Sequence, residues 1–173
     1  MPVTIRVKKT GPDIAAELAY LQSHEVRVGI LTGGTLPAGA SDASAPKKSD
    51  GKAPKVPLTV AEVFSFHELG RGRNPKRSSI VWAMDFRTEE IGKLSDKAML
   101  AVIDGKMTAR QALGLIGEKI VSLAKRRIKS KIPPPLSKSR LRQKMRAGKS
   151  GQTPLIHTGQ MINSLRWNII GSI

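Results

Sequence analysis

Histidine and carboxylate side chains are the residues of this chain best suited to acid–base or metal chemistry. The three histidines are His24, His67 and His157, and no two of them have the spacing that places two metal ligands on one helix face. The pair His67-Glu68 lacks the second histidine, four residues after the first, that a zinc protease motif requires. A single histidine on an amphipathic helix is more often structural, so the sequence predicts no metal site.

Other catalytic patterns are missing as well. The chain has no cysteine, which excludes a thiol nucleophile, a disulfide scaffold and zinc or iron–sulfur centres held by cysteine. The stretches Gly33-Gly34 and Gly70-Arg71-Gly72 are too short for a phosphate-binding loop and lack its strand–loop–helix context. No serine lies in a G-x-S-x-G turn, and the sparse carboxylates fall mostly on helix faces. We therefore predict a protein that is not an enzyme and that carries no cofactor.

Charge is the strongest feature of the composition. The 173 residues include 30 Lys and Arg against 13 Asp and Glu, a net charge of +17. Residues 1–100 hold 15 basic and 11 acidic side chains, whereas residues 101–173 hold 15 basic and only 2 acidic ones, Asp104 and Glu118. Like charges at this density repel each other, which predicts an acidic partner: nucleic acid, an anionic membrane or an acidic protein surface. The basic residues are densest in the stretch 119–149, at Lys119, Lys125, Arg126, Arg127, Lys129, Lys131, Lys138, Arg140, Arg142, Lys144, Arg146 and Lys149.

Two further observations narrow the choice of partner. No apolar run approaches the roughly 18 residues that span a bilayer, and residues 1–11 carry charges where a secretory signal is apolar, so we expect an intracellular protein without membrane contact. Aromatic residues make up 3% of the chain, too few for sequence-specific recognition of single strands. A non-specific nucleic-acid-binding module remains one hypothesis. A solvated basic helix face with a flexible basic loop is the simpler alternative.

Hydrophobic periodicity predicts one α+β domain over residues 1–173, with several helices packed against a small antiparallel sheet. Ser78–Met84 fits either a strand or a helix. Strands are predicted over 3–7, 25–30 and 165–170, and long helices over 88–103 and about 108–131. The buried face of the last helix is predicted to hold Ala112, Leu115, Ile116, Ile120, Leu123 and Ile128. Helix N-caps are predicted at Asp13, Thr59 with Glu62 as its capping-box partner, Thr108, Ser137 and Thr158, and a helix end at Gly70.

Two segments lack the pattern of packed structure. Residues 32–57 consist of Gly, Ala, Ser, Pro and Lys with almost no large apolar side chain, which predicts a flexible loop or an arm that orders on a partner. The prolines at 133–135 stop the long helix. Residues 138–152 are predicted to be a basic loop whose first part is a short helix reaching Met145.

Four motifs follow one another between residues 58 and 170. They are a helix ending in aromatic-His-Glu-x-Gly, a Pro-x-Arg turn, a turn and long helix closed by a proline run, and a Thr-Gly ending followed by Ser-Leu. The segments that carry them are Val60–Gly70; Asn74–Ser78; Asp104–Thr108 with Ala112-Leu113, Ile116-Gly117, Ile128–Ser130 and Ile132–Ser137; and Thr153–Met161 with Ser164-Leu165. Together and in this order, they resemble the motifs of phage tail-completion or virion morphogenesis proteins, the neck components that join head to tail in tailed phages. Lys144 stands where that family has a lysine before its Gly/Ser loop.

The resemblance implies a structural protein of the virion neck or tail region, made in the host cytoplasm and assembled in multiple copies around the DNA channel. The implied partners are copies of the chain itself and other neck, portal-adaptor or tail proteins, with weak DNA contact at most and no membrane. Residues 32–57 would be an arm ordered by neighbouring subunits, and the basic stretch 119–149 would face acidic subunits more readily than packaged DNA. The chain departs from the family at His157, where Asp is commoner, at Met161, where Leu is usual, and in the insertion 32–57.

This resemblance implies no active site, so the motif residues are candidates for assembly or for maintaining the fold. Pro75 and Arg77 would fix a turn and present a guanidinium to a neighbour's carboxylate, and the alternative for every motif is a role within the chain. The partner-binding candidates are Arg77, Lys125, Arg126, Arg127, Lys129, Arg140, Arg142, Lys144 and Arg146. The assembly or fold-motif candidates are His67, Glu68, Gly70, Pro75, Thr158 and Gly159.

Overall fold

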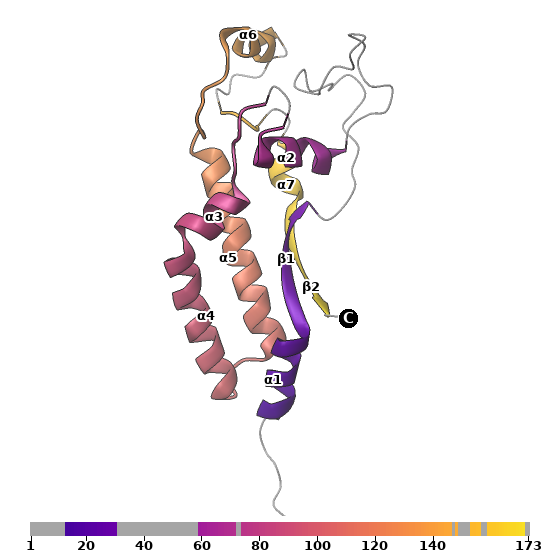
Figure 1. The fold of residues 1–173 in the computed structure, drawn as a ribbon, viewed down its shortest axis with the longest axis vertical. Coiled ribbons are helices and arrows are strands. Elements are labelled where there is room, and N and C mark those ends of the chain that lie inside the picture. Colours follow the sequence, from indigo (N-terminus) through magenta and orange to yellow (C-terminus); the bar gives the residue numbers. More distant parts are fainter. Residues whose placement is uncertain are drawn as a thin grey trace, which may run out of the picture.

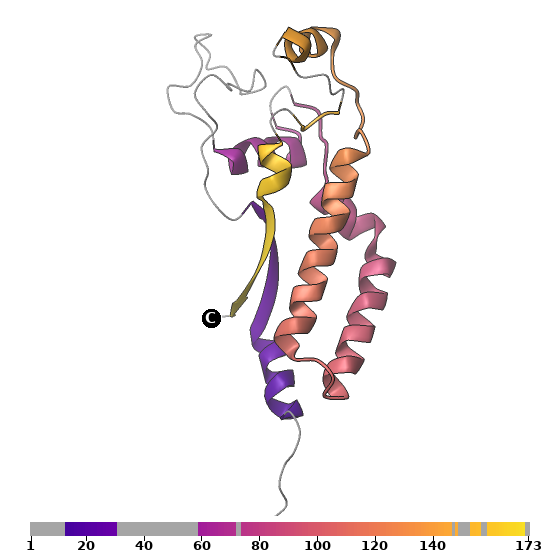
Figure 2. The ribbon, with the colours of Figure 1, turned by 180° about the vertical axis from the view of Figure 1, so that it is seen from behind.

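A long central helix, α5 (Ala109–Lys129), is the axis of the computed structural model. The helices α3 (Ile80–Phe86) and α4 (Thr88–Ile103) pack on one side of α5, and two strands pack on the other, as both views show (Figures 1 and 2). The structure describes residues 13–30, 59–71, 74–146, 148, 153–156 and 159–171. This arrangement of helices with a small antiparallel sheet confirms the predicted α+β class.

The two strands form an antiparallel ribbon, β1 (His24–Ile30) with β2 (Leu165–Gly171). Val28 lies opposite Trp167 and both pack against the core, whereas the neighbouring pair Arg27 and Asn168 is exposed. This alternation follows from the two-residue period of a strand. It places the apolar face of the ribbon against α5 and the polar face outside. The strand predicted over 3–7 and the arm predicted over 32–57 lie outside the described residues.

Local capping decides where several helices begin. Thr59 and Glu62 exchange both hydrogen bonds of a capping box, and Thr108 and Gln111 do the same at the start of α5. Asp13 accepts a hydrogen bond from a first-turn N–H, as predicted. Each bond satisfies an N–H that a helix start otherwise leaves without a partner. The remaining helices are α1 (Ile14–Ser23), α2 (Val60–Leu69), α6 (Lys138–Arg146) and α7 (Gln160–Ser164).

The core follows the inner faces of α5. The prediction of the buried face is confirmed at Ala112, Ile120, Leu123 and Ile128. It is wrong at Leu115, whose side chain is 44% exposed. Val121 and Ala124 are buried in addition, since α5 packs against helices on one side and strands on the other and needs a wider apolar surface than one stripe.

Helix α6 lies beyond the upper end of α5, apart from the body of the molecule (Figure 1). It confirms the short helix predicted after the prolines, and Ser137 Oγ accepts a hydrogen bond from Arg140 N–H at 3.3 Å. Apart from Gly148, the remainder of the predicted basic loop lies outside the described residues. Within the described ranges, no helix combines the length and apolarity needed to cross a membrane.

Candidate functional site

The first motif places a buried carboxylate at the start of α3. Glu68, on the last turn of α2, is 8% exposed. Its two oxygens accept hydrogen bonds from Ser79 N–H at 2.8 and 2.9 Å, from Ser79 Oγ–H at 3.0 Å and from Val81 N–H at 2.8 Å. Ser79 makes no cap of its own, so Glu68 caps α3 from another helix, at the helix end that favours negative charge.

Gly70 turns the chain between these two elements. Its backbone has φ +74°, and a Cβ there would lie 2.9 Å from Lys76 Cβ, so the position requires glycine both for its conformation and for the close approach of the loop. Pro75 is half-buried in that loop, and Arg77 N–H donates to the carbonyl of His67 at 2.7 Å. The returning loop therefore positions Ser79 in front of Glu68.

Arg77 points inward rather than toward a partner, which corrects the prediction made for it. It is 6% exposed, and its Nε–H and Nη2–H donate to the carbonyl of Pro134 at 3.1 and 2.6 Å. Burial lowers the pKa of Arg77 from its ordinary value. The guanidinium therefore joins the Pro-x-Arg turn to the proline run, 57 residues later in the chain.

Lys144 is the second predicted partner-binding residue that the structure turns inward. It is 6% exposed, and its Nζ donates to the carbonyls of Thr153 and Ile156 at 3.0 and 2.6 Å. Burial, and secondarily the charge of Arg140, lowers the pKa of Lys144. This contact ties α6 to the segment that precedes α7, so for Lys144 the alternative of a role within the chain is the one that holds.

Three of the four motifs thus meet through the polar contacts of Arg77, at the end of the molecule that carries α2 and α6 (Figure 1). The last motif adds Gly159, which precedes α7 with φ +78°. Thr158, the predicted cap of that helix, lies outside the described residues, and the structure places the N-cap at Gly159. Segments distant in sequence are therefore joined here by charged side chains bonded to backbone groups, contacts that are stronger than neutral ones.

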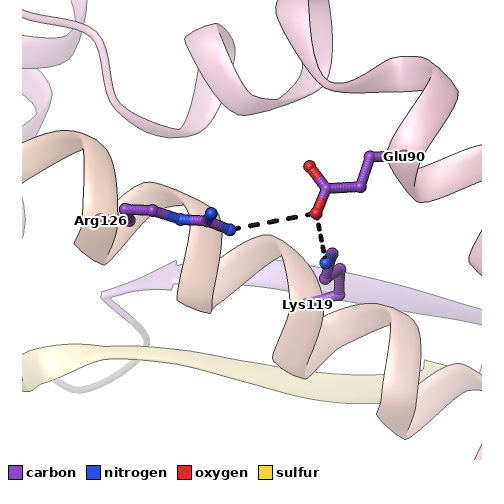
Figure 3. Close-up of polar contacts among 3 residues, drawn as sticks. All are labelled: Glu90, Lys119 and Arg126. Atoms are coloured by element: carbon purple, nitrogen blue, oxygen red, sulfur yellow. Dashed lines mark hydrogen bonds and ion pairs between the residues drawn. The ribbon is translucent and has the colours of Figure 1, made fainter.

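The basic end of α5 is partly neutralised within the chain. Glu90, in the first turn of α4, accepts a hydrogen bond from Lys119 Nζ at 2.5 Å, and Arg126 Nη2 lies 4.0 Å from the same oxygen (Figure 3). The hydrogen bond from Lys119 is the main cause that lowers the pKa of Glu90, with the charges of Lys119, Arg126 and Arg87 adding to it. This cluster joins α4 to α5, and it pairs Arg126, one of the predicted partner-binding cations, with a carboxylate of the same chain.

The lowered pKa of Glu90 predicts a pH-dependent contribution to folding. A carboxylate whose pKa is lower in the folded state stabilises the protein above its unfolded pKa, and the contribution is lost as pH falls through the folded value. The variant Glu90→Gln should therefore unfold at lower urea concentration than the parent at pH 7, and the difference should vanish well below the ordinary value of 4.5. Urea titrations at neutral and acidic pH measure this. A difference that persists unchanged in acid would contradict the ion cluster.

Aromatic contacts engage a second cation of α5. The guanidinium of Arg127 lies 4.7 Å from the ring centroid of Trp82, and that of Arg87 lies 5.3 Å from it. Trp82 also stacks on Phe86, whose side chain is exposed. Cations over an indole ring are attracted by its quadrupole, which holds both arginines against α3. Sequence reasoning missed this cluster, because no spacing rule relates Trp82 to Arg127, 45 residues later in the chain.

The remaining predicted cations lie nearer the solvent. Lys129, Arg142 and Arg146 are exposed, and Lys125 and Arg140 are half-buried. Arg140 Nη1–H donates to Gln143 Oε1 at 2.7 Å along α6. Among the described residues, no group of three His, Cys, Asp or Glu side chains lies close enough to hold a metal ion.

Comparison with known proteins adds no assignment: no family model matches the chain, and no curated protein or solved structure matches it either.

Proposed function

We propose that this chain is a structural protein of the neck of a tailed bacteriophage, which joins head to tail in multiple copies around the DNA channel. The proposal starts from the four ordered motifs of the sequence. What supports it in the structure is that Arg77, in the second motif, joins three of these motifs: its N–H donates to the carbonyl of His67 in the first, and its guanidinium donates to the carbonyl of Pro134 in the third. Residues of different motifs therefore share one role in holding the fold together, which motifs that matched the family by chance would have no reason to share.

The distribution of exposed cations is consistent with assembly. The basic side chains at the upper end of α5 and on α6 lie where few acids of the chain neutralise them, so neighbouring subunits or DNA would supply the opposite charge. Copies arranged by cyclic symmetry would place the same basic surface repeatedly around one axis. We propose other neck, portal-adaptor or tail proteins as further partners, and the virion as the location.

Deletion of the gene from the phage tests this proposal. Without the protein we expect filled heads and tails that fail to join, visible by electron microscopy, and a fall in infectivity that the parent gene restores in trans. Quantitative mass spectrometry of purified virions should find several copies per particle. The exposed variant Glu89→Ala, which changes only a solvated ion pair with Lys93, should complement as well as the parent. Infectious tailed particles that form without the protein would refute the proposal.

A further inference from the structure

Helix α6 presents one face made only of cationic and polar side chains. Lys138, Arg142 and Arg146 are spaced by four residues and therefore form a row along the helix, because positions four apart lie one turn above each other. All three are exposed, and the neighbouring Ser139 and Gln143 are exposed as well. The opposite face holds the buried Lys144 with the half-buried Arg140 and Leu141, which attach the helix to the chain.

The charge of this row is not neutralised within the described chain. α6 contains no acidic residue, and the ion pairs among the described residues involve none of the three side chains. Like charges four residues apart on a helix repel each other and disfavour the helix. By contrast, three of the five α5 cations that the sequence grouped with this row, Lys119, Arg126 and Arg127, are engaged by Glu90 or Trp82. The structure thus separates α6 from the rest of the basic stretch.

We propose that this row, Lys138, Arg142 and Arg146, binds the phosphate backbone of duplex DNA. The inference rests on the proposed neck function, in which copies surround the DNA channel, and it assigns the DNA contact to one helix face. Phosphate oxygens accept hydrogen bonds from Arg, Lys, Ser and Gln side chains, which are the types that this face presents. An acidic protein partner fits less well, because protein interfaces have an apolar centre and here the exposed Met145 lies only at the border of the row.

Matched charge variants of the full chain test the proposal. The triple variant Lys138→Ala/Arg142→Ala/Arg146→Ala removes the row. The control Lys97→Ala/Arg110→Ala/Arg166→Ala removes the same number of Lys and Arg from exposed positions on α4, α5 and β2. Fluorescence anisotropy with a labelled duplex of random sequence measures affinity over a range of salt concentrations. The unfolding midpoint of each variant, measured in urea, shows that it is folded.

Loss of three phosphate contacts should make the slope of log affinity against log salt about 2.7 shallower than in the parent. Over a fourfold rise in salt concentration, the affinity of the parent should therefore fall about 40-fold more than that of the row variant. The control should leave the slope unchanged. The charge-conserving variant Lys138→Arg/Arg142→Lys/Arg146→Lys should keep the slope of the parent, because phosphate contacts accept either cation.

Three results would overturn the proposal. Equal losses in the row variant and the control would mean that only net charge matters. An unchanged slope in the row variant would place DNA binding elsewhere. A row-dependent affinity for polyglutamate without one for duplex DNA would identify an acidic protein as the partner. Any of these results would leave the neck function standing if the protein is still found in virions, and absence from virions would reject the neck function whatever the DNA result.

Discussion

The substitution Glu68→Ala is expected to lower the free energy of unfolding by about 3 kcal/mol, because it leaves buried donors without an acceptor. The N–H groups of Ser79 and Val81 both donate to this carboxylate, and Ser79 is fully buried. Each unsatisfied buried donor costs about 1–3 kcal/mol. The start of α3 has no other side-chain cap, so the loss falls on the junction of α2 and α3.

Urea unfolding followed by circular dichroism measures this loss. Glu68→Gln keeps the volume and one carbonyl acceptor but faces the N–H donors with an amide, and we expect about half the loss of the alanine variant. The control Glu89→Ala removes a carboxylate that forms an exposed ion pair with Lys93, and it should cost about 0.5 kcal/mol or less. Native-state hydrogen exchange should report faster exchange at α3 in both Glu68 variants. Equal stability of Glu68→Ala and Glu89→Ala would refute the cap.

The second large effect is expected at Gly117, where the chain contradicts ordinary helix propensity. Gly117 lies on the buried side of α5 under the ring of Trp167, and a Cβ there would lie 2.8 Å from Trp167 Cγ and 3.0 Å from its Cβ. These atoms are close to the backbone of β2 and cannot move aside freely, and the indole N–H is held by Glu118 at 2.9 Å. Gly117→Ala should therefore destabilise the protein by about 1–3 kcal/mol through overpacking.

Gly92 provides the matched control for that substitution. It lies within α4, and a Cβ there would meet no atom within 4 Å. Gly92→Ala should thus stabilise the protein by about 1 kcal/mol, the usual gain for alanine over glycine inside a helix. Combining Gly117→Ala with Trp167→Leu should cost less than the sum of the two single changes, because the smaller side chain makes room. If both glycine substitutions stabilise the protein, the close packing of β2 on α5 is refuted.

Local signals in the sequence accounted for much of the fold. The capping boxes at Thr59 and Thr108 and the left-handed Gly70 depend on groups within a few residues, so spacing alone located them. The alternation of Val26, Val28 and Ile30 identified β1 in the same way. The run 78–84 could not be assigned from the sequence, because the carboxylate that caps it as a helix comes from Glu68 in another element.

Side-chain direction was the part of the candidate site that the sequence could not supply. Arg77 and Lys144 are cations in a basic chain, and only their distant acceptors, the carbonyls of Pro134, Thr153 and Ile156, turn them inward. Leu115 fits the apolar period of α5 and is nevertheless exposed, because periodicity identifies a helix face but not how far the neighbouring elements cover it.

By itself, the sequence determined the fold class, the positions of most helices and strands, and the excess of positive charge after residue 100, since these depend on composition and on short-range spacing. Only the tertiary structure decided which of those charges are used within the chain and which face outward. A buried hydrogen bond or a cation over a ring requires groups brought together by folding, and that proximity has no local signature. For this reason, the basic residues that the sequence presents as one group divide in the structure: Arg77 and Lys144 are bonded within the chain, whereas the three cations of the α6 row face outward.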